Sequence, residues 1–561
     1  MSNAINDVDD KDKGKDEPLV VNDKALNDTD SKKRILLLYG GTVGGMLLIV
    51  IIAFLIAVVL GGSKSSLTAK YVLDKNNLEA KLISENYLEQ ISSIEVDGEK
   101  INEIKETYTF NKEGPHTVIF KFKDSLDSIN EMFKDAINLE EADLSSFETS
   151  NLRNMSSMFY NCKSLKKVEF GQLSTDSVED MSYLFYGCTL LNEVPLENFN
   201  TSNLISMKKM FAKCSSLKTV NLLNFNISLV KTMRGLFSKC GSLENYIIPK
   251  DTVSSDVVDI GGMFRDCTTL KEINLKFLNT SIVSNMDKLF YNCINVESID
   301  LSKIKTDNVK NMSYLFYGCT NLAKADISNF NTLNVEDMQN MFFACSSLSS
   351  LDLTNFKTNN VKNMKNMFNR LTSVKSLDLS KFDTSQVTSM EGMFDSCILL
   401  EELDLSNFDT YNVKDMSYMF AGSSKLTSIK SSYLITRNTK TMYNMFYGCS
   451  NLEKIDLSSF DAYNLEDISG MFYGCSKLTS LDLSKLKTVK VKYMNQTFAK
   501  CSNLEYLDIR NFDNHSLLNK KPLLFSELKE KGKIIYNSEN FGLISQEEVG
   551  EEWTLEDVSR K

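Results

Sequence analysis

The chain has 561 residues, of which 63 are basic and 74 acidic, so its formal net charge at pH 7 is −11. This balance argues against nucleic-acid binding, which needs a basic patch, and is compatible with a soluble ectodomain. The sequence has no HExxH, GxSxG or GxxxxGK motif and only two histidines, His116 and His515. A lone histidine is more often a surface or packing residue, so we expect no enzyme, cofactor or metal site.

The N-terminal 60 residues predict a membrane anchor. Residues 1–31 contain nine acidic residues and little apolar content, which is typical of a disordered tail. Lys32, Lys33 and Arg34 precede an uncharged run long enough to span a bilayer. We therefore predict a transmembrane helix over 35–60 and an acidic cytoplasmic tail over 1–34, because the basic cluster sets that side in the cytoplasm. A cleaved signal peptide is the alternative, although the lead and the apolar run are both too long for one.

Two glycine pairs lie inside the predicted transmembrane helix. Gly40 is four residues before Gly44, and Gly41 is four residues before Gly45. Small residues at this spacing allow two helices to approach closely, which predicts a dimer face. The alternative interpretation is that glycine is simply common in membrane helices.

The segment 61–124 precedes the repeats described below and is predicted to be a linker followed by a small β-rich cap. Its strand patterns fall at 93–96, 107–110 and 116–122. Asp97 and Gly98 predict a tight turn after the first of these strands. Such a cap would cover the open end of a stack of repeats.

A strict period dominates the chain from residue 125 to residue 510. The phenylalanine of each "MF" or "LF" pair, here called the marker phenylalanine, recurs at a step of 26 residues, and only the step from Phe237 to Phe264 is 27. The other pattern exceptions lie at residues 241–259, 370–371 and 430–440. A period of this length indicates a solenoid, in which each coil buries its apolar face against its neighbours. The markers are Phe133, Phe159, Phe185, Phe211, Phe237, Phe264, Phe290, Phe316, Phe342, Phe368, Phe394, Phe420, Phe446, Phe472 and Phe498.

Residues 397–423 serve as the template of one coil. Leu403, Asp404 and Leu405 alternate apolar with polar, which predicts a short strand with one buried face. Val413, Met416 and Met419 follow at steps of three, which predicts a short helix, with Asn412 and Asp415 at its start. Each coil is therefore expected to run strand, turn, helix, turn.

The pattern C-x-x-L-x-x-L-D-L-S-x-F-x-T-x-x-V-x-x-M-x-x-M-F resembles that of the BspA-like leucine-rich-repeat surface proteins of bacteria and protists. The resemblance implies an α/β repeat fold: a curved leucine-rich-repeat solenoid of about fifteen 26-residue coils over 125–510. Periodicity is lost after Phe512, so 511–561 is predicted to be a C-terminal cap. The resemblance also implies an extracellular recognition role, since proteins of this family are often adhesins, and it implies no catalytic residues.

All twelve cysteines occupy one repeat position, three residues after a marker phenylalanine. Neighbouring helices would hold them about 8–10 Å apart, which exceeds the Cα separation of about 7 Å that a disulfide tolerates. We therefore predict buried free thiols, with a disulfide framework as the alternative. Because Ala136, Leu371 and Ser423 occupy the same position elsewhere, we expect this position to select side-chain size. The cysteines are Cys162, Cys188, Cys214, Cys240, Cys267, Cys293, Cys319, Cys345, Cys397, Cys449, Cys475 and Cys501.

The residue between the two strand leucines points away from the core and is mostly acidic. Strands stack more closely than helices, so we expect the strands to line a concave side and this acidic row to face a partner. The alternatives are local hydrogen bonds to turns and to nearby serines, or bound metal ions. Five consecutive coils place a carboxylate here, and we call them the acid column: Asp300, Asp326, Asp352, Asp378 and Asp404.

A second row, the tyrosine column, directly follows the marker phenylalanines. Exposed tyrosine suits partner binding, and simple stacking along the solenoid is the alternative. The sequence thus predicts a single-pass membrane protein whose extracellular solenoid binds a protein or glycan, centred on the acid column. A structural surface protein without a specific ligand is the alternative function. The column contains Tyr160, Tyr186, Tyr291, Tyr317, Phe343, Tyr447 and Tyr473.

Overall fold

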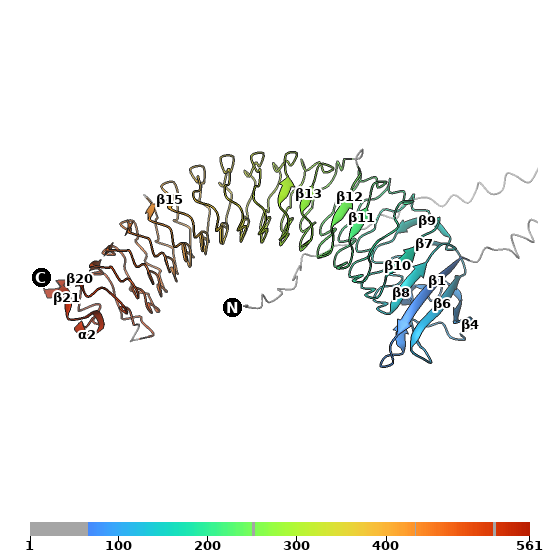
Figure 1. Cartoon of the computed structure of the whole chain (residues 1–561), viewed down its shortest axis with the longest axis horizontal. Coiled ribbons are helices and arrows are strands. Elements are labelled where there is room, and N and C mark those ends of the chain that lie inside the picture. The colour runs from blue at the N-terminus through green and yellow to red at the C-terminus, as the bar shows by residue number, and fades with distance from the viewer. Residues whose placement is uncertain (1–64, 250–252, 432–433, 520–522, 561) are drawn as a thin grey trace, which may run out of the picture. The chain divides into compact units, whose positions relative to one another are not determined.

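The computed structural model describes residues 65–249, 253–431, 434–519 and 523–560. The predicted tail and transmembrane helix, with their glycine pairs, lie outside these residues. In the part of the chain that the structure describes, no helix combines the length and apolarity needed to cross a bilayer. The described residues belong to one compact unit, 64–561, in which the coils stack side by side (Figure 1).

A mixed sheet covers the N-terminal end of the stack. Its strand order is β10-β8-β1-β6-β3-β4, and β1 pairs antiparallel with both β6 and the first-coil strand β8. Strand β8 then pairs parallel with β10 of the second coil, so the sheet continues directly into the solenoid. The strands of this region are β1 Ser66–Leu73, β2 Glu79–Lys81, β3 Ile91–Val96, β4 Glu99–Lys100, β5 Thr107–Thr109, β6 Gly114–Phe122, β7 Leu126–Ser128, β8 Leu139–Asp143, β9 Thr149–Asn154 and β10 Lys167–Glu169.

Short parallel strands follow at the position of the alternating leucines. Each contains two or three residues and pairs with its neighbour one coil away. They are β11 Thr219–Asn221, β12 Asn245–Ile247, β13 Glu272–Asn274, β14 Ser298–Asp300, β15 Glu402–Asp404, β16 Ser428–Lys430, β17 Lys454–Ile455, β18 Ser480–Asp482 and β19 Tyr506–Asp508. Between Asp300 and Glu402, a stretch that the structure describes throughout, no strand forms.

The C-terminal end is closed by two longer strands. Strand β20 (Lys531–Tyr536) pairs parallel with β19, and β21 (Glu552–Asp557) pairs with β20. Trp553 is buried and donates its indole N–H to the backbone of Lys529. The described residues contain one α-helix, α2 (Gln546–Val549), and two 3-10 turns, η2 (Glu85–Tyr87) and η3 (Val558–Arg560).

The predicted helix of each coil is wrong, and with it the α/β class. Residues 415–422 form tandem turns: Met419 and Ala421 donate their N–H groups to carbonyls three residues back. Alternate N–H groups instead donate to the next coil, as Tyr418 does to the carbonyl of Tyr443 at 2.8 Å. Tyr418 has a φ of 58° and Gly422 a φ of 66°, which a right-handed helix cannot contain. Tandem turns place Met416, Met419 and Phe420 in the core as a helix would, so the spacing alone did not distinguish them.

Coil-to-coil spacing differs between the two sides of the stack. Stacked rings of the tyrosine column are 4.5 Å apart for Tyr317 and Phe343, whereas the markers Phe316 and Phe342 are 5.4 Å apart. Near the strands, Phe356 and Phe382 are 6.4 Å apart. The stack therefore bends toward the tyrosine column, which lies on its inner side. In Figure 1 the arrows of β13 and β15 lie toward the outer side of the arc.

The expected placement of the strands on the concave side is consequently wrong. That expectation assumed helices, which need more room than strands; without helices the argument does not apply. The residues before the first methionine of each coil, from Asn154 to Tyr493, form an unbroken series of parallel bridges along the inner side. The acid column belongs to the outer side, where the strand ladder is interrupted.

Candidate functional site

Each carboxylate of the acid column closes a local turn. Asp326 Oδ1 accepts hydrogen bonds from the N–H and hydroxyl of Ser328, at 3.2 and 2.6 Å. Equivalent N–H bonds reach Asp300, Asp352, Asp378 and Asp404 from the residue two positions on. The alternative interpretation of this column, local hydrogen bonding to turns and serines, is confirmed for these contacts.

These contacts favour the charged form of all five carboxyls. The pKa of each is lowered from its ordinary value, for Asp300 chiefly by the ammonium of Lys276 at 2.8 Å. For Asp378 the backbone N–H of Ser380 contributes most, and for the other three the neighbouring hydroxyl does. Carboxylates in the next coil oppose this effect at Asp326 and Asp352, but the hydrogen bonds outweigh them. The column is thus a row of ionised, solvent-facing side chains.

The tyrosine column forms three separate stacks of nearly parallel rings. Tyr160 lies on Tyr186 at 4.6 Å, and Tyr447 lies on Tyr473 at 4.7 Å. The third stack runs from Tyr291 through Tyr317 to Phe343. Stacking along the solenoid, the alternative interpretation of this column, is therefore present, and it coexists with exposed ring edges on the inner side.

Cations cover the ends of these stacks by a fixed rule. The first ring of a stack is covered from the residue 26 positions earlier: Lys134 over Tyr160, Arg265 over Tyr291. The last ring is covered from the residue 27 positions later: Lys213 over Tyr186, Arg370 over Phe343, Lys500 over Tyr473. The cation-to-centroid distances are 5.1 to 5.8 Å, within the range of cation–π attraction.

One stack end differs from the other five. Position 421, which lies 26 residues before Tyr447, holds alanine, and no described Lys or Arg covers that ring. Tyr447 is 41% exposed, more than any other ring of the three stacks. It also borders a shallow depression of about 370 Å³. The depression is lined by Tyr443, Asn444, Tyr447, Asp467, Ser469, Gly470, Tyr473, Tyr493, Asn495 and Gln496.

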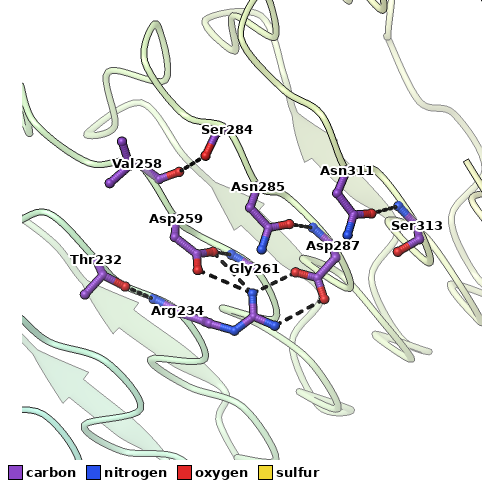
Figure 2. Close-up of polar contacts among 10 residues, drawn as sticks. All are labelled: Thr232, Arg234, Val258, Asp259, Gly261, Ser284, Asn285, Asp287, Asn311 and Ser313. Atoms are coloured by element: carbon purple, nitrogen blue, oxygen red, sulfur yellow. Dashed lines mark hydrogen bonds and ion pairs between the residues drawn. The ribbon is translucent and has the colours of Figure 1, made fainter. Parts of the chain in front are cut away.

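The irregular coil carries a charge cluster that crosses three coils (Figure 2). The Arg234 Nη1 atom is 2.8 Å from Asp287 Oδ1 and 3.3 Å from Asp259 Oδ1. Gly261 makes this reach possible, because a Cβ there would lie 2.4 Å from both Arg234 and Asp287. The cluster thus joins the coils on either side of the single 27-residue step.

The cysteine position has a hydrogen-bonding role. Each of the twelve buried thiols donates to the carbonyl of the marker phenylalanine one coil earlier, as Cys319 does to Phe290 at 3.1 Å. Ser423 makes the same bond to Phe394 at 2.7 Å. The prediction of free, buried thiols is confirmed, but the position does not select size alone. Burial raises the pKa of the thiol groups, to about 12 for Cys319.

The two histidines take unrelated local roles. His116 is buried in the N-terminal sheet and bonds to Asp97 at 2.7 Å and to the carbonyl of Lys112. His515 is on the surface and bonds to Asp513 at 2.9 Å. In the described ranges, no group of three or more His, Cys, Asp or Glu is arranged to hold a metal ion.

Several inner-side residues were missed by the sequence reasoning, notably Tyr418, Tyr443, Tyr493 and the covering cations. The signal that could have found them is registry: they recur at fixed offsets of 26 or 27 residues from a tyrosine-column member. Aligning the coils by their marker phenylalanines places all of these side chains on one face.

The family model described as "Mycoplasma protein of unknown function, DUF285" matches residues 89–172, 166–272, 258–376, 343–454 and 440–530. The chain belongs to this family. A search of curated proteins finds no match.

Solved structures include two similar bacterial proteins. One is a leucine rich cell surface protein from Faecalibacterium prausnitzii A2-165, with 17% identity, covering 69% of this chain and 88% of that chain, at a TM-score of 0.27. The other is a leucine-rich repeat protein from Eubacterium ventriosum, also with 17% identity, covering 55% and 82% at a TM-score of 0.30. The resemblance to leucine-rich-repeat surface proteins is confirmed for repeat and fold, and at this identity it says nothing of a ligand.

Proposed function

We propose that the protein is a membrane-anchored surface protein whose extracellular solenoid binds a protein or glycan partner. The observation that supports this most is the variation of inner-side residues on a constant backbone. The position of Ser313 is held in other coils by Lys208, Arg234, Glu391 and Tyr443, although the turn geometry is the same. A purely structural position would not require such variety, whereas a surface that recognises a partner would.

The anchor and its orientation are tested on intact cells. External protease should digest the repeats and leave residues 1–34 protected, since the basic cluster sets that side in the cytoplasm. A mature N-terminus near residue 62 would instead show a cleaved signal. Cross-linking of the full chain before and after Gly40→Leu and Gly44→Leu tests the proposed helix dimer.

Binding is tested with the labelled full chain on arrays of extracellular glycans and proteins. A saturable partner supports recognition. The absence of any partner at micromolar concentration would favour a structural surface protein, the alternative function.

We keep the acid column as a proposed contact for a basic partner. Changing Asp300, Asp326, Asp352, Asp378 and Asp404 together to Asn should preserve the fold. Asn221 and Asn274 already close the same turn in their own coils, with Oδ1 accepting the N–H two residues on. Binding should fall sharply and should also weaken as salt screens the charges. If the Asn variant binds as well as the parent chain at low salt, the column is solvated surface and the inner side is the contact.

A further inference from the structure

The inner side divides into two regions of opposite charge. The turn segments 206–213, 232–239, 259–266 and 285–292 contain seven Lys or Arg and three Asp. The segments 389–396, 415–422, 441–448, 467–474 and 493–499 contain no Lys or Arg, but hold Glu391, Asp395, Asp415 and Asp467. The open ring of Tyr447 lies in this second, cation-free region.

We propose that the open face of Tyr447 binds a cationic side chain, an arginine or a lysine, of a basic protein partner. This inference rests on the proposed recognition function and specifies its partner. Five of the six stack ends hold a Lys or Arg over the ring at 5.1 to 5.8 Å, which shows the chemistry that this surface accepts. At the sixth end, Ala421 leaves the equivalent place open to a partner.

The surroundings of Tyr447 favour a positive group. Asp467 lines the same depression, and the structure shows no ion pair for it among the described residues. Its one hydrogen bond to this coil is accepted from the N–H of Ser469 at 2.8 Å, which leaves its other carboxylate oxygen for a second donor. Asn444 and Gln496 at the rim supply amide oxygens. A planar guanidinium can stack on an aromatic face while donating hydrogen bonds from its edge, and this combination fits such a site.

The depression exists because one side chain is missing from the rim. Gly470 has a φ of 61°, and a Cβ at this position would lie 2.0 Å from Asn444 Oδ1. Equivalent coils place Asn366, Tyr418 or Gln496 here. The aliphatic part of an incoming arginine or lysine would rest above Gly470, between Tyr443 and Tyr493.

The test uses the purified full chain and a defined peptide. A capped nonapeptide of alternating arginine and glycine is titrated by calorimetry at about 0.15 M salt, at which exposed charges are screened beyond roughly 8 Å. The matched control is the same peptide with citrulline, which has the shape of arginine without its charge. The arginine peptide should bind saturably, and the citrulline peptide about tenfold more weakly.

Two variants separate the ring from its surroundings. Tyr447→Ala should weaken binding of the arginine peptide about tenfold, and Tyr447→Phe should leave it nearly unchanged, because the ring face is retained. Tyr186→Ala is the matched control, since that stack end is already covered by Lys213 and should contribute nothing.

Ala421→Arg is the sharpest variant. It recreates the arrangement of Arg265 over Tyr291, so the chain would cover its own ring and exclude the peptide. Circular dichroism and the melting temperature check that this variant folds, and Tyr447→Ala provides the same test without an added side chain. Equal binding of arginine and citrulline peptides, or parent-like binding by folded Ala421→Arg, would overturn the proposal.

The outcomes also separate this inference from the proposed function. If the chain binds an array partner saturably and Tyr447→Ala does not alter that affinity, recognition stands and the Tyr447 site is wrong. If peptide affinity follows the five Asp→Asn changes but not Tyr447→Ala, the acid column is the cation site and this proposal fails. If no array partner binds while the peptide requires Tyr447, the site is supported and the proposed function is not.

Discussion

The outer and inner sides of the solenoid share one 26-residue period but are built differently. On the outer side, strands of two or three residues pair in places and are absent from 301 to 401, while the exposed aspartates close turns. On the inner side, backbone bonds join every coil to the next, and the exposed residues vary freely. Regular side chains therefore mark structural roles on the outer side, and irregular ones mark candidate recognition on the inner side.

The largest expected effect comes from the core that separates the two sides. Phe316→Ala should lower the free energy of unfolding by about 3–5 kcal/mol, because it removes a fully buried ring and leaves a cavity. Urea titration followed by circular dichroism measures this loss. Asp326→Asn on the outer side is the matched control and should change stability far less, since its turn is retained. A loss for Phe316→Ala no greater than that of the control would show that the stack is not held by its ring core.

Much of this fold could be predicted from the sequence, because a strict period locates every coil and every column. Marker phenylalanines, cysteines and leucines all fall in the core at the expected positions. The helix prediction failed because Met416, Met419 and Phe420 have the same spacing in tandem turns as in a helix. The deciding signal was present: the position of Tyr418 is held by Gly392, Gly470 or Asn444 in other coils, residues that favour positive φ and disfavour helices.

The inner side of the candidate site could be predicted less well. Curvature depends on which column has the tighter spacing, and the wrong helix assignment reversed that comparison. The covering of Tyr160 by Lys134 depends on side chains one coil apart, which a reading of single coils does not reveal. By contrast, local hydrogen bonding of Asp326 to Ser328 was expected from sequence, since both residues lie in the same turn.

The next largest effect is expected at the irregular coil. Asp287→Ala should cost about 1–3 kcal/mol, because the partly buried Arg234 loses its shortest charge-assisted contact. Gly261→Ala should weaken the same cluster, since the added methyl group displaces Arg234 from its path to Asp287. Ser313→Ala, at the equivalent position of a regular coil, is the control. Urea titration of all three variants would contradict the cluster's role if Asp287→Ala were as stable as Ser313→Ala.

A smaller effect is expected at the cysteine position, where the chain itself supplies the comparison. Cys319→Ala should cost about 1 kcal/mol, since the carbonyl of Phe290 loses one of its donors. Cys319→Ser should cost less, because Ser423 shows that a hydroxyl makes the same bond. Chemical denaturation of both variants provides the test, and a serine variant less stable than the alanine variant would mean that this position selects apolarity instead.

The smallest effect concerns the outer side and depends on pH. The folded-state pKa values of the acid column are lowered, so their ionised forms stabilise the fold above the unfolded value of about 3.9 and lose that contribution as pH falls further. The melting temperature of the parent chain should therefore drop more than that of the five-Asn variant between pH 5 and pH 3. Melting of both proteins at pH 7, 5 and 3 measures the difference, which should be constant above pH 5 and shrink below it. Because these side chains are exposed and screened, the shift should be modest at about 0.15 M salt and larger at low salt. A difference that does not change with pH would mean that the turn bonds form equally well with neutral carboxyls, and that the outer side contributes charge to recognition but not to stability.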